Sequence, residues 1–329
     1  MDPDRKAGPG APAARGCRPR RHWGWRRGRV LAGLAAVAAW LLVFPRAVPD
    51  APGRPGSLLE TFLPWLGLAV PLLLVPALVR RSLTALVALA LPIAGWLGRF
   101  GGALPPPGAA PYDLTVVQHN VSDENPDPAG TARALMAAGP QLVALEELTP
   151  AALPAYRAQF AARYPHHAVH GTVGLWSAYP LRDVRPLDIA PAGFGADWQR
   201  ALRATAVTPH GEVAVLVAHL PSVRLGAAAG FGSGPRDESA ALLGGAIAAE
   251  EREALILLGD LNATVDDRGL APVASRLRPP PPSFALSWPA AFPLARIDQV
   301  MTRSADVTRL WTLPATGSDH LPVGAHIRL

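Results

Sequence analysis

Residues 254–262 read ALILLGDLN, an apolar run that ends in the polar motif Gly259-Asp260-Leu261-Asn262. Two further polar motifs follow, Arg296-Ile297-Asp298 and Gly317-Ser318-Asp319-His320. Each motif borders a segment with the composition of a β-strand, so a sheet would gather their side chains into one pocket. Carboxylate and amide oxygens suit a hard divalent cation such as Mg²⁺, and a nearby histidine can transfer protons. This combination indicates phosphoester hydrolysis.

Positive charge is concentrated at the N-terminal end of the 329-residue chain. Residues 1–29 hold nine Lys or Arg against two Asp, whereas residues 112–329 hold 17 Arg against 21 Asp or Glu. We therefore expect a basic tail over residues 1–29 and a mildly acidic catalytic domain over residues 112–329. A domain that follows a nucleic-acid backbone is usually basic, so the charge argues against nucleic acid as a partner.

Apolar stretches dominate the chain between the tail and the catalytic domain. Residues 30–44, 61–79 and 82–98 are uncharged runs of 15, 19 and 17 residues. A helix of about 20 apolar residues crosses a bilayer. We expect three transmembrane helices that form a membrane anchor over residues 30–99, followed by a short linker over residues 100–111, rich in Gly, Ala and Pro. A buried helical core is one alternative, and a cleaved signal peptide is another for the first run.

The distribution of Lys and Arg predicts the orientation of this anchor. The nine basic residues of the tail, together with Arg80 and Arg81 between the second and third runs, would lie on one side of the membrane. Arg46, Arg54 and Arg99 would lie on the other. We therefore expect a multi-pass protein of the cell membrane with a cytoplasmic N-terminus and an extracytoplasmic catalytic domain.

Short apolar runs and helical stretches are mixed in the expected catalytic domain, a pattern typical of an α/β fold. The expected strands are Leu114–Asn120, Leu142–Glu146, Val213–His219, Ala254–Leu258 and Ile297–Thr302. The expected helices are Ala129–Ala138, Ala151–Arg163 and Arg236–Glu250.

Six motifs follow one another across this domain. They are Gln118-His119-Asn120, Leu145-Glu146-Glu147, His219-Leu220-Pro221-Ser222, Gly259-Asp260-Leu261-Asn262, Arg296-Ile297-Asp298 and Ser318-Asp319-His320. By these motifs, residues 112–329 resemble the endonuclease/exonuclease/phosphatase superfamily. The resemblance implies a four-layer sandwich of two packed β-sheets flanked by helices. It also implies a phosphatase or phosphodiesterase that depends on Mg²⁺, with Mn²⁺ as the alternative ion.

The resemblance further implies a role for each matching residue. Glu147 would bind the metal ion, with Asp319 as a second carboxylate on the metal side. Asn120 would help to position that ion and the phosphate. Asp260 and Asn262 would orient the phosphate and the water that attacks it.

The histidines would handle protons. His320 would exchange a proton, with Asp298 fixing its tautomer and stabilising its cation. His219 matches a branch of the superfamily in which a second histidine contacts the scissile phosphate or protonates the leaving group. Glu146 is expected at the surface, because the superfamily usually has an amide at this position.

Each of these residues also has a structural alternative. The Asp260 and His320 motifs could form ordinary turns after strands. Asp298 could pair with Arg296 along one strand, and Glu147 could be a charge at the start of a helix. Asn120 and His219 could simply close their strands.

Three functions are compatible with the sequence. The first is a membrane-anchored phosphoesterase at the outer membrane face, acting on a polyprenyl-linked or other lipid phosphate of cell-wall synthesis. This arrangement resembles actinobacterial membrane proteins associated with teicoplanin-type glycopeptide resistance. The alternatives are a surface-tethered nuclease and a non-catalytic membrane protein of the same fold.

Overall fold

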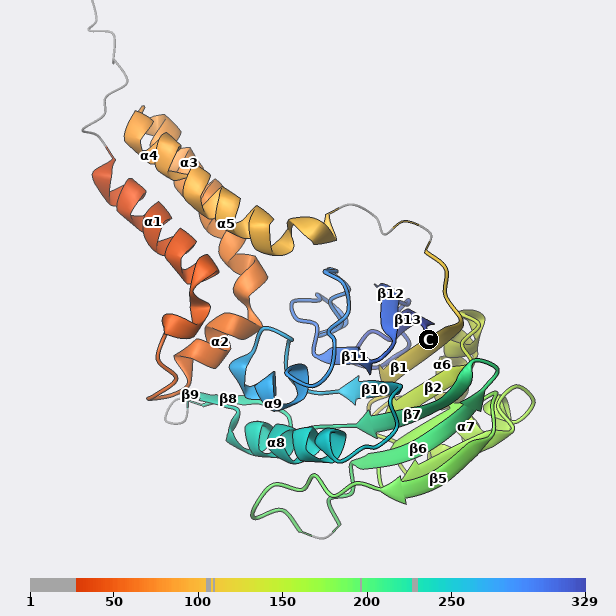
Figure 1. Cartoon of the computed structure of the whole chain (residues 1–329). Coiled ribbons are helices and arrows are strands. Elements are labelled where there is room, and N and C mark those ends of the chain that lie inside the picture. Colours follow the sequence, from red (N-terminus) through yellow and green to blue (C-terminus); the bar gives the residue numbers. More distant parts are fainter. Residues whose placement is uncertain (1–27, 105–107, 109, 196, 227–229) are drawn as a thin grey trace, which may run out of the picture.

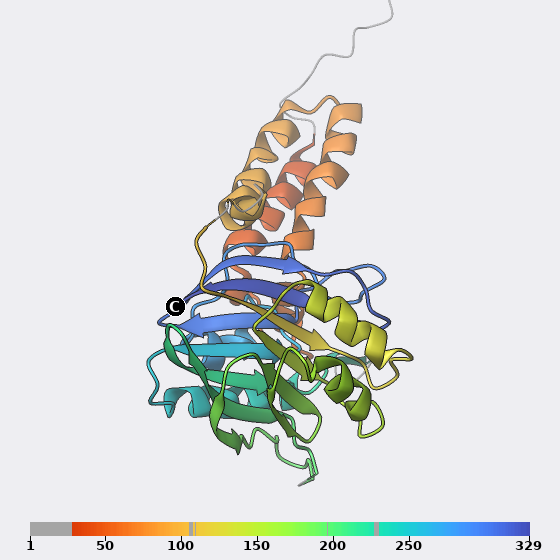
Figure 2. The same ribbon diagram turned by 90° about the vertical axis from the view of Figure 1, so that its right-hand side faces the viewer.

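The computed structural model describes residues 28–104, 108, 110–195, 197–226 and 230–329. Most of the expected basic tail, including Cys17, and part of the expected linker lie outside these ranges. The described chain has two parts, a group of apolar helices and an α/β domain, with the helices projecting from one end of the domain (Figures 1 and 2).

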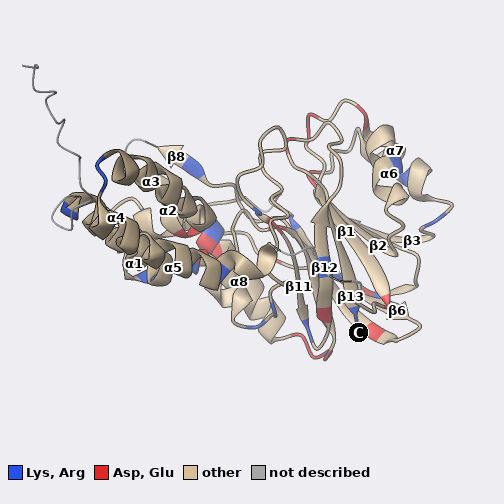
Figure 3. Ribbon diagram, turned by 90° about the horizontal axis from the view of Figure 1, so that it is seen from above, with Lys and Arg blue, Asp and Glu red and all other residues tan. Residues whose placement is uncertain are grey.

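The first part consists of short helices, most of which run side by side (Figure 1). They are α1 (Arg29–Val43), α2 (Pro55–Thr61), α3 (Ala69–Val79), α4 (Leu83–Ala88) and α5 (Ala90–Phe100), with 3₁₀ turns at Pro45–Ala47, Leu63–Leu68 and Gly101–Ala103. Helix α1 contacts α3, α4 and α5, whereas α2 contacts the α/β domain near β9. Helices α1, α3, α4 and α5 carry few charged residues along their length (Figure 3).

Two mixed sheets form the centre of the α/β domain. The first has the order β12-β13-β1-β2-β4-β3 and the second the order β11-β10-β7-β6-β5. The strands of the first sheet are β1 (Leu114–Asn120), β2 (Leu142–Glu146), β3 (His166–His170), β4 (Val173–Ser177), β12 (Asp306–Thr312) and β13 (Val323–Arg328). Those of the second are β5 (Leu181–Pro186), β6 (Ala201–Thr208), β7 (Gly211–Ala218), β10 (Leu255–Asp260) and β11 (Asp298–Arg303). A small ribbon of β8 (Arg224–Gly226) and β9 (Gly230–Gly232) lies beside α2.

The two sheets pack face to face, because alternate residues of their strands are apolar and point inward. Val116 of β1 and Ile256 of β10 belong to the single buried cluster between the sheets. Helices α6 (Pro128–Ala137) and α7 (Leu153–Phe160) cover the outer face of the first sheet. Helices α8 (Gly234–Ala248) and α9 (Ala271–Ala274) cover the second. The expectation of two packed sheets flanked by helices is therefore confirmed.

The expectation of three transmembrane helices is not supported. Among the described residues, one helix, Leu83–Ala103, is long and apolar enough to cross a membrane. The pair Pro55–Thr61 and Leu63–Val79, bent by 77°, would count as a second if it formed one span. Helix α1 has 15 residues, or about 22 Å at 1.5 Å per residue, which is short of a bilayer core of about 30 Å. The second expected span is shortened because its first turns pack on the α/β domain, where Thr61 donates to Asp267 and Trp65 donates to the Leu294 carbonyl.

An ion pair and a side-chain hydrogen bond join the helices to the domain. Arg268 forms two hydrogen bonds of 2.9 Å to the carboxylate of Glu60, which is fully buried in α2. Within the domain, Arg236 of α8 is 2.8 Å from Asp267, and both side chains are buried; Asp267 in turn accepts a hydrogen bond from Thr61 of α2. Removing one partner of such a pair leaves an uncompensated buried charge. The apolar helices and the α/β domain are therefore tightly coupled.

Another buried ion pair connects the end of α8 to the second sheet. Arg203 of β6 donates to Glu250 at 2.8 Å and 3.0 Å, and the two side chains are 6% and 4% exposed. The hydrogen bonds from Arg203 lower the pKa of Glu250 below its ordinary value. A carboxyl group with a lowered pKa in the folded state stabilises the protein above its unfolded pKa, and this stabilisation is lost as the pH falls through the folded pKa.

We expect Glu250→Gln to lower the free energy of unfolding by about 3 kcal/mol at neutral pH, because buried Arg203 then loses its hydrogen-bonded carboxylate and keeps only the more distant Asp183, at 3.7 Å. The difference from the native protein should shrink as the pH falls through the lowered pKa of Glu250. Thermal unfolding of the full chain between neutral and acidic pH measures both effects. The matched control is Glu212→Gln, whose pair with Arg252 is 31% and 41% exposed and should contribute less than about 1 kcal/mol. Equal unfolding midpoints for the two variants would contradict the expectation.

Candidate active site

The predicted site residues lie where strand ends of the two sheets meet. Strands β1 and β2 are parallel and pair Asn120 with Glu146, so Asn120 and Glu147 end up side by side. Strands β7 and β10 are also parallel, which brings His219 next to Asp260. Carboxyl ends of parallel neighbours lie at the same edge of a sheet. The apolar sandwich thus brings four separate motifs to one edge.

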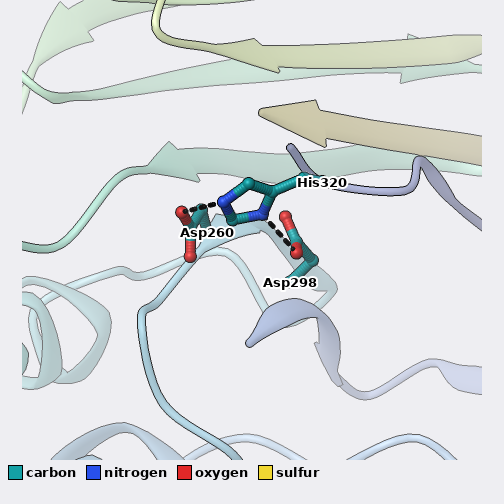
Figure 4. A group of neighbouring side chains, drawn as sticks. All are labelled: Asp260, Asp298 and His320. Carbon is teal, nitrogen blue, oxygen red and sulfur yellow. Dashed lines mark hydrogen bonds and ion pairs between the residues drawn. The ribbon is translucent and has the colours of Figure 1, made fainter. Parts of the chain in front are cut away.

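Asp260, Asp298 and His320 form the centre of the site (Figure 4). Asp260 and Asp298 are directly opposite each other in the antiparallel pair of β10 and β11. His320 lies in the loop before β13, and its Nδ1 is 2.8 Å from Asp298 Oδ2. Its Nε2 is 3.7 Å from Asp260 Oδ2. All three side chains are buried, so the imidazole is held between two carboxylates with little access to bulk water.

This arrangement shifts the pKa values of the imidazole and of one carboxyl in the same direction. Burial lowers the pKa of His320, but the Asp298 and Asp260 carboxylates outweigh burial and raise the pKa to about 10. Burial raises the pKa of Asp260 to about 7, against the lowering effect of His320. His320 is therefore protonated at neutral pH, and Asp260 can exchange a proton near neutrality.

Asn120 connects the carboxylates of the two sheets. Its amide nitrogen donates to Glu147 Oε1 at 3.0 Å and to Asp260 Oδ2 at 3.1 Å. Glu147 has the left-handed backbone angle φ of 59°, which turns its side chain back toward this centre just after β2. The Glu147 side chain is 30% exposed, so it lies at the open side of the buried centre.

His219 and Arg200 complete one side of the site. His219 Nε2 is 3.6 Å from Asp260 and 3.8 Å from Glu147. Burial and the neighbouring Arg200 hold the pKa of His219 well below its ordinary value, so its ring is neutral. Arg200 Nη1 is 3.3 Å from His219 Nδ1. The neutral ring can then accept from Arg200 at Nδ1 and donate from Nε2 toward the carboxylates.

Arg200 was not found by sequence reasoning. It precedes β6, belongs to none of the six motifs and comes next to His219 because β6 and β7 pair. Its guanidinium lies 5.2 Å from the ring centre of Trp198, a cation–π contact that restrains it. No spacing in the sequence points to this residue, since its position depends on the sheet register. It adds a positive charge beside the acidic centre.

Asn262 and Asp319 lie differently from the rest. The Asn262 side-chain amide donates to the Leu220 carbonyl at 2.9 Å, and its backbone N–H donates to Asp260 Oδ1 at 2.9 Å. Asn262 thus orients Asp260 and links the ends of β7 and β10. Asp319 is exposed, and it lies outside the group formed by Asp260, Asp298 and His320. The role of Asp319 as a metal ligand stays a prediction.

Glu146 is not at the surface, so that expectation is wrong. Its side chain is fully buried, and its two carboxylate oxygens have no hydrogen-bond partner among the described residues. The reason is register: Glu146 pairs with Asn120, so both side chains point into the space between the sheets. Burial, reinforced by Asp298 and Asp260, raises the pKa of Glu146 well above its ordinary value. Its buried position therefore favours the neutral form of Glu146 beneath the site.

The donors present fit a metal ion. One ligand atom from each of Asp260, Asp298 and His320 lies within 4.8 Å of the others, a spacing that could hold an ion once His320 has released its proton. Asp298 and His320 already share a hydrogen bond, whereas Glu147 presents its carboxylate on the more open side and is joined to the buried Asp260 carboxylate through Asn120. Oxygen donors of this kind suit a hard divalent cation.

The chain belongs to the Endonuclease/Exonuclease/phosphatase family, which it matches over residues 78–320. No curated protein matches the chain by sequence. Among solved structures, TDP2 of D. rerio in complex with a single-strand DNA product matches with a TM-score of 0.55 and 17% identity over 66% of this chain and 99% of that chain. An endonuclease/exonuclease/phosphatase from Beutenbergia cavernae matches with a TM-score of 0.53 and 21% identity over 67% of this chain and 72% of that chain. A beta toxin from Staphylococcus aureus matches with a TM-score of 0.52 and 15% identity over 65% of this chain and 99% of that chain. These likenesses establish the fold of the domain.

We expect Asp298→Asn to reduce kcat for phosphoester hydrolysis on the order of 10³-fold. The amide keeps the shape of the carboxylate but does not stabilise the His320 cation and allows the wrong tautomer. Release of nitrophenol from nitrophenyl phosphate and bis(nitrophenyl) phosphate by the full chain measures the effect. The matched control is Asp306→Asn in β12, which pairs with Arg278 and Arg328 away from the site and should keep the native rate. A native kcat in Asp298→Asn would refute the role of this pair.

Proposed function

We propose that the protein is a membrane-anchored phosphoester hydrolase that depends on Mg²⁺, or on Mn²⁺ as the alternative ion. The observation that supports this proposal most directly is the buried Asp298–His320 pair, which faces Asp260 at positions that match the family's motifs. Its proposed substrate is a phosphate ester of a lipid, such as a polyprenyl-linked phosphate of cell-wall synthesis, at the outer membrane face. The resemblance to actinobacterial membrane proteins associated with resistance adds a role in glycopeptide resistance to this proposal.

The chemistry follows from the geometry of the side chains. Asp260 orients the attacking water and accepts its proton, supported by Asn262, whose N–H holds its second oxygen. His320 gives a proton to the leaving oxygen, and Asp298 stabilises the imidazolium that does so. His219 donates from Nε2 to a phosphate oxygen. These roles require two groups of opposite protonation state in one pocket, which the different environments of Asp260 and His320 supply.

A divalent ion bound by Glu147 would neutralise charge that develops on the phosphate oxygens in the transition state. Asn120 holds Glu147 and Asp260 together, so both carboxylates can face the same ion and phosphate. Asp319 is the proposed second carboxylate on that side. Arg200 supplies a further positive charge for the phosphate.

The surface of the apolar helices supports the membrane anchor. Val30 of α1, Leu72 of α3 and Val79 of α3 are 76%, 71% and 72% exposed. Only 22% of the apolar window in Leu83–Ala103 is buried inside the protein, which disfavours a buried core helix. An exposed apolar surface of this extent is typical of a membrane-facing surface. An active site held close to a bilayer also meets a high effective concentration of lipid head groups.

We expect Glu147→Gln to lower the hydrolysis rate at least ~100-fold at saturating substrate and to raise the Mg²⁺ concentration needed for half-maximal rate, because one metal ligand loses its charge. The experiment assays the full chain against hexadecyl phosphate, a phosphodiester and DNA, with Mg²⁺, Mn²⁺ or EDTA. Glu124→Gln, an exposed carboxylate, is the control and should behave as the native protein.

Each outcome of this assay decides between functions. Hydrolysis of the lipid phosphate that is abolished by EDTA supports the proposal. Rapid cleavage of DNA with no release of phosphate from lipid esters would favour a tethered nuclease. No turnover of any substrate, with a folded chain and added metal, would favour a non-catalytic protein.

The orientation of the anchor can be tested with the single cysteine of the sequence, Cys17. In intact cells, a membrane-impermeant maleimide should not label the native chain, because Cys17 lies in the expected cytoplasmic tail. The double variant Cys17→Ser with Glu124→Cys should be labelled, because Glu124 is exposed on the catalytic domain. In lysed cells, the maleimide should label both the native protein and the double variant. The reverse pattern in intact cells would overturn the proposed outward orientation.

A further inference from the structure

A cavity lies where the apolar helices meet the α/β domain. Its volume is about 300 Å³, and its walls come from both parts of the chain. Phe100 at the end of α5 lines one side, and the proline-rich loop around Pro280 lines another. Thr264, two residues after Asn262, and Arg296, two residues before Asp298, line the domain side. The cavity is therefore built partly from the loops that carry the active site.

Arg296 gives this cavity a positive charge that has no salt-bridge partner among the described residues, although the Asp266 carboxylate acts on it from beyond ion-pair distance. Its side chain is 8% exposed, and its Nη1 has no hydrogen-bond partner among the described residues. Asp266, an acidic residue that also lines the cavity, is engaged by Arg99 at 2.6 Å. The hydroxyl of Thr264 likewise lacks a partner within the described chain. A buried cation without a partner is costly, so the cavity is suited to an anion with oxygen acceptors.

An apolar groove adjoins the cavity. It has a volume of about 570 Å³ and shares Pro64, Phe284 and Leu286 with the cavity. Its remaining walls are side chains of the apolar helices and of the turn before α3, among them Trp65, Leu68, Ile93 and Leu97. These side chains offer no charge to a ligand, and Leu68, Ile93 and Leu97 are 51%, 40% and 47% exposed. The groove is suited to a hydrocarbon chain.

Together, the charged cavity and the apolar groove match an amphiphilic ligand with one anionic end and one hydrocarbon end. Trp96 of α5 stacks on Phe284 with ring centres 5.9 Å apart, which fixes the helices against the domain at the junction of the two spaces. The buried ion pair between Glu60 and Arg268 fixes the same interface. The binding surface is therefore preorganised, which reduces the entropy lost on binding.

We propose that this cavity and groove form a binding site for a single lipid phosphate, separate from the centre formed by Asp260, Asp298 and His320. Arg296 and Thr264 bind the phosphate, and the groove holds the hydrocarbon chain. A neutral lipid from the surrounding bilayer would occupy only the apolar groove. The positive charge of Arg296 in the cavity selects instead for a lipid with an anionic head group. The site rests on the proposed membrane anchoring and not on the proposed hydrolysis.

The test measures equilibrium binding of radiolabelled hexadecyl phosphate to the full chain in phosphatidylcholine nanodiscs, with EDTA to exclude turnover. Hexadecanol and inorganic phosphate serve as comparison ligands. The native chain should bind hexadecyl phosphate at least tenfold more tightly than hexadecanol, and it should bind inorganic phosphate weakly. Arg296→Met should remove this preference and leave hexadecanol binding unchanged. The matched control is Arg309→Met, an exposed arginine in β12.

A second variant tests the groove and does not disturb the buried arginine. Ile93→Trp fills the groove from the surface of α5 and should weaken binding of both hexadecyl phosphate and hexadecanol at least fivefold. The thermal midpoint of each variant shows whether it is folded. If Arg296→Met fails to fold, the result for Ile93→Trp and the preference of the native chain decide.

Several results would overturn this site. Equal binding of hexadecyl phosphate and hexadecanol by the native chain would mean that the groove binds bilayer lipids without selecting their head groups. Inorganic phosphate that competes as well as hexadecyl phosphate would mean a site for a soluble anion. Native affinity in Ile93→Trp would exclude the groove. If hydrolysis fails in the metal-dependent assay but selective binding persists, the proposed function is wrong and this site stands.

Discussion

Hydrogen bonds between the two sheets hold the acidic centre together at one edge of an apolar interface. Gln118 of β1 donates to Asp298 at the start of β11, and Asn120 of β1 donates to Asp260 at the end of β10. His320, which precedes β13, pairs with Asp298 from the opposite sheet. A buried polar group that lacks its partner costs free energy. These contacts therefore require one relative position of the sheets, and that same position creates the site.

The acidic centre works only because its groups lie in different environments. Burial and mutual repulsion raise the pKa values of Glu146 and Asp260, whereas two carboxylates keep His320 protonated despite its burial. A carboxyl group whose neutral form is favoured, a carboxylate near its pKa and an imidazolium thus lie within one small volume. Groups with separated pKa values are what a general acid–base mechanism requires.

The attachment of the helices to the domain gives this centre a fixed place. Helix α2 is bound to the domain by the buried pair of Glu60 and Arg268, and the following turn is bound through Trp65. Such contacts do not allow the domain to move freely on a flexible tether. They place the loops of the active site next to the apolar helices, and this arrangement creates the cavity that contains Arg296.

The sequence by itself determined the fold class, the order of the motifs and several strands. Strands β1 and β2 were predicted to the residue, because each is a short apolar run that ends at a polar motif. Strand β5 was not predicted, because its mostly exposed residues lack an apolar pattern. Asn120, Glu147, His219, Asp260, Asp298 and His320 were chosen from the sequence and lie together. Their roles remain predictions.

Only the tertiary structure decided the burial of Glu146, the position of Arg200 and the exposure of Asp319. Pairing of β1 with β2 turns Glu146 inward, and pairing of β6 with β7 brings Arg200 to His219. The same holds for the expected second span, whose apolar composition could not reveal that its first turns pack on the domain. The physical reason is that composition and spacing report local preferences, whereas register and packing depend on residues far apart in the chain.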